Sequence, residues 1–118
     1  MGDQTNTCIF CRIVAGELPA EELASSPLTF AFRDVSPVMP SHVLVVPREH
    51  IESAATVEPA HAEMLSELLQ TAQRVAESEG LGERGWRLVL NVGEDARNSV
   101  PHLHMHVLGG RPMDWPPG

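Results

Sequence analysis

The sequence predicts a single α+β domain in which an antiparallel sheet of about five short strands carries one long helix and one short N-terminal helix. Three observations lead to this prediction. The chain has 118 residues, 42% of them hydrophobic and 20% charged, which is typical of one compact domain. Helical periodicity extends over only one long stretch. The remaining apolar segments are short, rich in β-branched residues and separated by turn residues.

The first half of the chain begins with a polar segment, residues 1–7, which we expect to be a disordered tail. Residues 8–15 are expected to form a short helix that ends at Gly16. Strands are then expected at 18–24, 28–33 and 42–47. The last of these is a continuous β-branched run, which is typical of a central strand.

The second half contains the long helix, predicted over residues 57–79 because its apolar side chains form one stripe. Strands follow at 86–91 and 100–108, with a polar loop between them. The segment 111–118 is too rich in proline for regular structure, since proline cannot donate a backbone hydrogen bond. Residues 8–118 are therefore expected to form one domain that ends in this tail.

The charge balance excludes several functions. Aspartate and glutamate number 16 against 8 basic residues, a formal net charge of -8, so we expect no binding to a nucleic acid polymer. Every basic residue is an arginine, which excludes lysine chemistry such as a P-loop or a Schiff base. No apolar run is long enough to cross a membrane and no signal peptide is evident, so we expect no membrane partner and a cytoplasmic location.

Three of the six histidines, His102, His104 and His106, fall within five residues. On a strand they would share one face, while the apolar residues between and after them would share the other and pack beneath the helix. Three interpretations are open: half-exposed surface residues, a metal site that uses all three imidazoles, or a phosphate-handling site with one imidazole as nucleophile. The third is favoured, because packing alone does not require adjacent imidazoles that titrate near neutral pH.

The segment His102-Leu-His104-Met-His106-Val-Leu resembles the motif of the histidine triad (HIT) superfamily. Further segments are similar to its Hint branch, the histidine triad nucleotide-binding proteins, and extend the resemblance over nearly the whole chain: 8–20, 31–37, 41–50, 91–93 and 107–118. The resemblance implies the HIT-like fold, paired into a homodimer. It also implies hydrolysis of purine nucleoside phosphoramidates or related nucleotidyl conjugates through a covalent nucleotidyl-histidine. The alternatives are a dinucleoside polyphosphate hydrolase, a nucleotide-binding regulatory protein and a metal hydrolase with the triad as ligands.

The same resemblance implies catalytic roles for four residues. His104 would be the nucleophile, and His106 would hold the nonbridging phosphate oxygens. Ser99 would bind phosphate and assist the departing amine, although a turn serine is the alternative interpretation. His42 would support the triad.

The resemblance also implies a nucleotide pocket. Asp34 would bind the ribose hydroxyls and Asn91 would face the phosphate, although turn and strand-end roles explain these residues equally simply. Arg33 stands beside the base where relatives have another residue, so we expect it to affect base preference. Trp115 from one chain would lie near the partner's phosphate site and contact the leaving group. Apolar residues that match the purine slot, and that could equally be core, are Ile9, Phe10, Ile13, Leu18, Phe32 and Val35.

The only two cysteines, Cys8 and Cys11, form one C-x-x-C pair. A redox pair and two unliganded thiols are the alternatives to a metal site. The resemblance pairs these cysteines with His50 and His102, which would complete the four ligands that structural zinc prefers. We therefore expect one structural zinc ion per chain.

Overall fold

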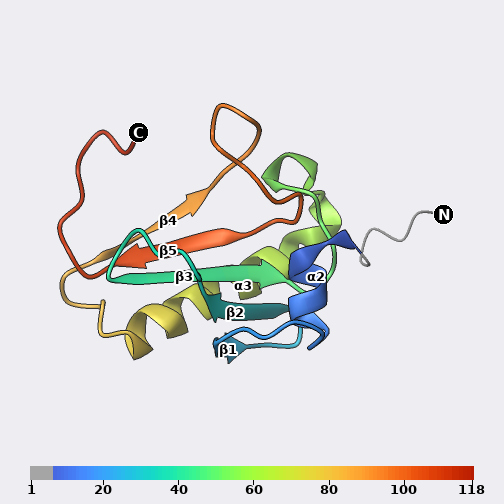
Figure 1. Ribbon diagram of the computed structural model, residues 1–118, viewed down its shortest axis with the longest axis horizontal. Helices are drawn as coiled ribbons and strands as arrows, with labels where there is room; N and C mark the ends of the chain where they lie inside the picture. Colours follow the sequence, from blue (N-terminus) through green and yellow to red (C-terminus); the bar gives the residue numbers. More distant parts are fainter. Residues whose placement is uncertain (1–6) are drawn as a thin grey trace.

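The computed structural model describes residues 7–118, so the predicted N-terminal tail lies, except for Thr7, outside the described residues. The described chain contains one five-stranded antiparallel sheet, in the order β1-β2-β3-β5-β4 (Figure 1). The strands are β1 (Glu22–Ser25), β2 (Thr29–Arg33), β3 (Ser41–Pro47), β4 (Trp86–Leu90) and β5 (Met105–Gly109). The helices are α2 (Ile9–Val14) and α3 (Ala62–Ser78). This architecture confirms the predicted fold class.

The sheet is covered on both faces where β2 and β3 lie. On one face, Ala31, Val43 and Val45 pack with the apolar stripe of α3, which runs along the sheet (Figure 1). On the other face, the alternate residues of β2 and β3 pack with Phe10 and Cys11 of α2. Every residue of β3 is therefore buried, which explains the uninterrupted apolar run from Val43 to Pro47.

Three elements begin four or five residues later than predicted, and a proline lies near each of these starts. The first strand begins at Glu22 instead of residue 18, after a turn at Gly16 (φ 79°) and Pro19. The long helix begins at Ala62 instead of residue 57, because two separate 3₁₀ turns, Ala54–Thr56 and Pro59–His61, precede it. In the first turn, Ser53 and Thr56 form a capping box at the N-terminal end.

The last strand begins at Met105 instead of residue 100. Pro101 has no backbone N–H to donate to a ladder, and the amides that follow it bond elsewhere. The N–H of His102 donates to the carbonyl of Val100, and the N–H of Leu103 donates to the carbonyl of Ile51. His102 therefore lies in irregular backbone just before β5.

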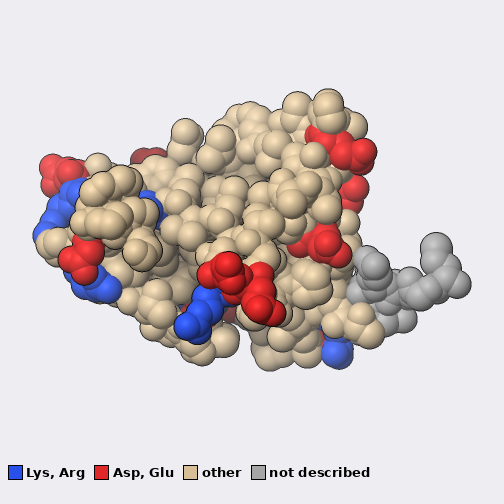
Figure 2. Space-filling view, turned by 90° about the horizontal axis from the view of Figure 1, so that it is seen from above, with Lys and Arg blue, Asp and Glu red and all other residues tan. Residues whose placement is uncertain are grey.

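Strand β4 forms one edge of the sheet and is half-exposed along most of its length. Leu90 at its end and Val92 just beyond it are exposed apolar side chains. In the view from above, charged side chains lie toward both ends and in one group just below the middle, and the area above that group is largely uncharged (Figure 2). No helix in the described part of the chain is long and apolar enough to cross a membrane.

Candidate functional site

The side chains of residues 103–107 alternate between the two faces of the sheet, as predicted for a strand. Leu103, Met105 and Val107 belong to the core beneath α3. His104 and His106 lie on the opposite face, with their ring centres 5.2 Å apart. The difference from the prediction is His102, which precedes the strand and turns toward Cys8 and the rest of the N-terminal helix.

The protonation of His104 follows from its partner. Its Nδ1 lies 2.8 Å from the backbone carbonyl oxygen of His102, which can only accept a hydrogen bond. Nδ1 must therefore carry the proton, and the neutral ring keeps its lone pair on Nε2. The ring is 9% exposed and lines an open cavity, so it is available to react there.

His106 belongs to a hydrogen-bonded chain of side chains. The N–H of Val38 donates to Nδ1 of His42, so neutral His42 carries its proton on Nε2. That nitrogen lies 2.8 Å from Nδ1 of His106 and 3.3 Å from Oδ2 of Asp34. Donation to His106 leaves the proton of neutral His106 on Nε2. His106 can then offer an N–H donor while neighbouring His104 offers a lone pair.

Burial lowers the pKa of His106 and of His42 and so keeps both imidazoles neutral near pH 7. Desolvation, followed by the charges of His104 and His42, lowers the pKa of His106 to about 4, although Asp34 opposes the shift. Desolvation also lowers the pKa of His42, against the attraction of Asp34. The N–H of His106 is therefore that of a neutral ring in the free protein.

The histidines line one end of a cavity of about 430 Å³, here called the apolar cavity. This volume suits a small organic ligand. The cavity brings together nearly all of the residues expected around a nucleotide, namely Ile9, Phe10, Ile13, Leu18, Phe32, Arg33, Asp34, Val35, Ser99, His104 and His106. Four lining residues were missed, Pro19, Ala20, Leu44 and Val100, because apolar residues of a turn or a strand carry no signal that separates pocket from core.

Two charged residues of the apolar cavity are already bonded within the chain. The guanidinium of Arg33 donates to both oxygens of Glu79, at 2.9 and 3.1 Å, and to Glu21. These bonds raise the pKa of Arg33, against its desolvation, and they tie the end of β2 to α3. Oδ1 of Asp34 accepts the N–H of Ser36, so the second oxygen, 3.3 Å from His42, remains the better acceptor for a ligand.

A second cavity, of about 300 Å³, lies on the other side of His104 and His106 and is here called the Arg97 cavity. It shares Ser99, His104 and His106 with the apolar cavity. Asn91, expected at the phosphate, lines this second cavity instead, and its Nδ2 donates to the carbonyl of Ala96. The other lining residues are Val38, His42, Val89, Arg97 and Leu108.

Trp115 is not part of either cavity within one chain. Its ring is 80% exposed and lies beneath the guanidinium of Arg87, 5.8 Å from the ring centre. Arg87 also donates to the carbonyl of Asp114. The tail is therefore held near β4, and its predicted contact with a partner's phosphate site stays a prediction.

The predicted metal ligands converge. The ligand atoms of Cys8, Cys11, His50 and His102 all lie within 4.8 Å of one another. Sγ of Cys11 is 3.2 Å from Nδ1 of His50 and 3.4 Å from Nδ1 of His102. Sγ of Cys8 is 3.3 Å from the same nitrogen of His102. These separations are close to the roughly 3.6 Å expected between sulfur and nitrogen ligands of tetrahedral zinc.

The surroundings of this cluster also suit a metal. Nε2 of His102 lies 3.0 Å from the carbonyl oxygen of Pro47, so it carries the proton and Nδ1 keeps its lone pair toward the thiols. Desolvation, opposed by that carbonyl, lowers the pKa of His102 to about 4, which favours the neutral ring that a metal requires. The N–H of Cys11 donates to Sγ of Cys8, as is suitable for a thiolate. The residues therefore fit zinc.

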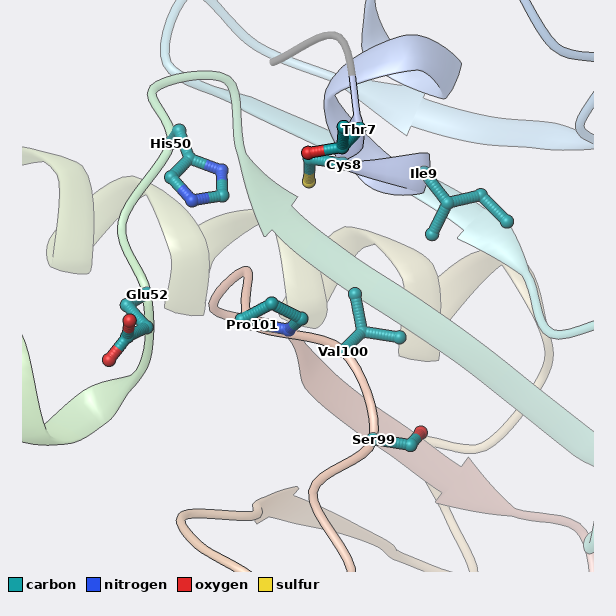
Figure 3. A pocket seen from close by; sticks show the side chains of 8 residues that line it. All are labelled: Thr7, Cys8, Ile9, His50, Glu52, Ser99, Val100 and Pro101. Atoms are coloured by element: carbon teal, nitrogen blue, oxygen red, sulfur yellow. The ribbon is translucent and has the colours of Figure 1, made fainter. Parts of the chain in front are cut away.

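A third cavity, of about 400 Å³, adjoins the metal ligands. Figure 3 shows the imidazole of His50 and the thiol of Cys8 on one side of it, and Val100 and Pro101 on the other. The cluster is therefore accessible from this side through His50. Ser99 lies at the margin shared with the other two cavities.

Comparisons with known proteins place these features in a family. The family model described as HIT domain matches residues 15–113. The chain is 42% identical to the 14 kDa zinc-binding protein of Zea mays over 93% of this chain and 87% of that protein. It is 41% identical to Adenylylsulfatase HINT1 of Arabidopsis thaliana over 93% of this chain and 76% of that protein. The crystal structure of a HIT family hydrolase from Legionella pneumophila Philadelphia 1 superposes with a TM-score of 0.91 at 43% identity, covering 94% of this chain and 99% of that chain.

Proposed function

The chain belongs to the HIT domain family and is a nucleotide hydrolase, and we propose that it cleaves purine nucleoside phosphoramidates or related nucleotidyl conjugates to a nucleoside monophosphate and a leaving group. The observation that carries this proposal is the tautomer of His104. Its proton is held on Nδ1 by a backbone carbonyl, so its Nε2 lone pair is free at the end of a nucleotide-sized cavity. A neutral imidazole in this state is a nucleophile toward phosphorus.

The reaction proceeds in two displacements at phosphorus. In the first, Nε2 of His104 forms a bond to the α-phosphorus, and the bond from phosphorus to the leaving nitrogen breaks, with the electron pair going to the nitrogen. An amine leaving group takes up a proton, which Ser99 helps to deliver because it stands at the junction of the cavities. In the second displacement, water attacks phosphorus and the imidazole departs, so the nucleoside monophosphate is released and His104 is regenerated.

His106 and Asp34 orient the substrate. The Nε2–H of His106, adjacent to His104, donates to a nonbridging phosphate oxygen and stabilises the charge that develops there. His42 holds His106 in this tautomer. The carboxylate of Asp34 accepts from the ribose hydroxyls, with Asn91 on the far side of the phosphate.

The purine lies between apolar side chains of α2 and β2. Phe10 and Phe32 pack edge to face, with ring centres 5.5 Å apart, and form one wall of the slot. Ile9, exposed at 49%, provides an apolar surface that a base would cover. Arg33 affects base preference by holding the rim of the slot, since its guanidinium is bonded to Glu79 and Glu21.

The metal has a structural role in this proposal. Cys8, Cys11, His50 and His102 hold one zinc ion, which links α2, the segment after β3 and the segment before β5. When bound, zinc supplies cross-links between these segments and no Lewis acid to the substrate. His102 is thereby kept in place, and its carbonyl stays directed at His104.

We further propose that two chains form a homodimer through the β4 edge. The exposed Leu90 and Val92 support this arrangement, as does the largely uncharged area in the upper part of Figure 2. Trp115 of the partner would then lie near the leaving group. The cytoplasmic location stays a prediction.

The test compares two substrates of the purified, zinc-loaded protein. We expect faster release of AMP from adenosine 5′-phosphoramidate than from a diadenosine polyphosphate, and an adduct of AMP mass on His104 in a rapidly quenched digest. Preference for the diadenosine compound would indicate the polyphosphate hydrolase. Tight AMP binding without turnover of either substrate would indicate the regulatory alternative.

A further inference from the structure

The Arg97 cavity contains a single permanently charged side chain among the described residues that line it. That side chain is Arg97, in the loop between β4 and β5. The cavity begins where the apolar cavity ends, at Ser99, His104 and His106. When a nucleoside occupies the apolar cavity, the group on the other side of the phosphorus therefore lies in the Arg97 cavity.

Arg97 occupies this place at a conformational cost. Among the described residues it is the only one other than glycine with a positive φ, at 64°. The conformation closes a turn in which the N–H of Arg97 donates to Glu94 and the N–H of Asn98 donates to Gly93. Glycine adopts this conformation freely, whereas a side chain costs about 1 kcal/mol. Asn91, which donates to Ala96, holds the same turn at the end of β4.

The guanidinium of Arg97 makes no hydrogen bond or ion pair within residues 7–118, so the side chain itself forms no contact in this part of the chain that offsets that cost. The acidic residues of its own turn, Glu94 and Asp95, form no ion pair with it. Arg84 is likewise without a side-chain partner in the described chain but lies outside the cavities described above. The remaining arginines have partners: Arg12, Arg33, Arg48, Arg74, Arg87 and Arg111.

We propose that Arg97 binds an anionic, tetrahedral leaving group, a sulfate or a phosphate, attached to the α-phosphate of the nucleotide. This inference rests on the proposed function and specifies its substrate class. In a protein with a net charge of -8, an anion gains little from the overall field, so a local guanidinium is needed to select it. Its planar fork suits two oxygens of such a group.

The leaving step differs from that of an amine. With a sulfate conjugate, Nε2 of His104 forms its bond to phosphorus while the bond from phosphorus to the bridging oxygen breaks. The electron pair stays on that oxygen, and sulfate departs as a dianion without taking up a proton. Arg97 stabilises the added negative charge on the departing group, and water then releases AMP from His104 as before.

The test measures kcat/KM for adenosine 5′-phosphosulfate and adenosine 5′-phosphoramidate with the wild type, Arg97→Gly and the charge-matched control Arg84→Gly. Glycine relieves the strained φ, so Arg97→Gly should fold with an unchanged or slightly higher Tm. We expect Arg97→Gly to lower kcat/KM about 10- to 100-fold for the phosphosulfate and less than about 3-fold for the phosphoramidate. Arg84→Gly should change both by less than about 2-fold. Equal changes for both substrates, or none, would overturn the proposal.

A binding measurement separates this proposal from the proposed function. If the wild type cleaves neither substrate, the proposed hydrolysis is wrong, and calorimetry with ADP and AMP still tests Arg97. The β-phosphate of ADP takes the place of the leaving group, so the wild type should bind ADP more tightly than AMP, and Arg97→Gly should lose most of that difference. An ADP to AMP affinity ratio that is the same in both proteins rejects a phosphate contact. If Arg97→Gly loses turnover of the phosphosulfate while its ADP to AMP affinity ratio equals that of the wild type, the site is assigned to sulfate.

Discussion

His102 and His106 lie four residues apart and both have a pKa near 4, chiefly because both are desolvated, yet their free nitrogens serve different chemistry. His102 donates to Pro47 and turns its lone pair to two thiols. His106 accepts from His42 and turns its N–H to a cavity. The proposed metal region around His102 and the proposed catalytic region around His104 and His106 show that the partner of the second ring nitrogen decides what an imidazole can do.

The two regions also differ in their relation to solvent. His102 is fully buried, and both cysteines are buried beside α2. His104 and His106 lie where two cavities meet. A mostly buried ligand set, in which His50 is the most exposed member, suits a structural ion, whereas a site between two cavities can admit a substrate on one side and release a product on the other. The following predictions test this division.

The largest effect is expected from His104→Gly. Removal of the nucleophile should lower kcat for adenosine 5′-phosphoramidate by a factor on the order of 10⁴ or more. Zinc content, Tm and AMP affinity should stay near those of the wild type, because His104 is not a metal ligand. His61→Ala, which removes a histidine outside both regions, is the control. Turnover near that of the wild type in His104→Gly would reject the mechanism.

Cys11→Ser should have the opposite effect to His104→Gly: zinc and thermal stability should be lost while turnover is kept. Loss of one ligand should release zinc, measured by metal analysis, and lower Tm by about 10 °C or more, since metal binding contributes directly to folding. The fraction that remains folded should keep kcat within a few-fold, and Cys8→Ser should behave in the same way. If the native protein carries no zinc and both thiols react freely, the metal region has been misinterpreted.

The pH dependence of stability isolates the contribution of His106. Its pKa near 4 lies below the ordinary value of 6.5, so between these values the unfolded chain binds a proton that the folded chain does not. The stabilisation is complete above pH 6.5 and is lost as the pH falls to about 4, by an amount on the order of 2 to 3 kcal/mol.

The measurement is the free energy of unfolding by denaturant at several pH values for the wild type and His106→Gln, both zinc-loaded. Because only the wild type contains His106, its free energy of unfolding should fall relative to that of His106→Gln as the pH drops from 6.5 to about 4. Contributions from His102 and its metal are present in both proteins and cancel. Parallel curves from pH 7 to pH 4 would show that His106 does not titrate as the structure indicates.

The smallest effect is expected from deletion of residues 112–118. The metal region is complete within one chain, whereas the catalytic region is predicted to take Trp115 from a partner. The deletion should leave AMP affinity within about 2-fold and change kcat/KM a few-fold, differently for small and bulky amine leaving groups. Equal scaling for all substrates, or a monomer at micromolar concentration in sedimentation, would remove the basis for this prediction.

The sequence was sufficient for the fold class because β-branched runs and one amphipathic stripe specify a sheet and a helix. It was also sufficient for the two-sided division of Leu103, His104, Met105 and His106, which depends only on alternation. The predicted first residue of an element was wrong where hydrogen bonds to residues distant in the sequence decide where the element begins. The N–H of Leu103, for example, bonds to Ile51, and nothing near residue 103 reveals that partner.

The sequence predicted most of the residues that line the two cavities, but not the hydrogen bonds that these residues make. Motif positions predict that Asn91 faces the phosphate, but they do not show that its amide holds the turn at Ala96. Arg97 gave no local signal, because a left-handed conformation is expected of glycine or asparagine and not of arginine. Such a residue is found only when the backbone angles and the cavity lining are examined together.

The acceptor that orients His104 is a backbone oxygen, and this has a consequence for how the protein tolerates mutation. In many enzymes a carboxylate side chain orients the reactive histidine, and a single substitution can remove it. Here the carbonyl of His102 is present whatever side chain stands at that position. A lineage could therefore replace Cys8, Cys11 or His50, and with them the zinc ion, and still inherit a correctly protonated nucleophile, provided that the backbone before β5 kept its path.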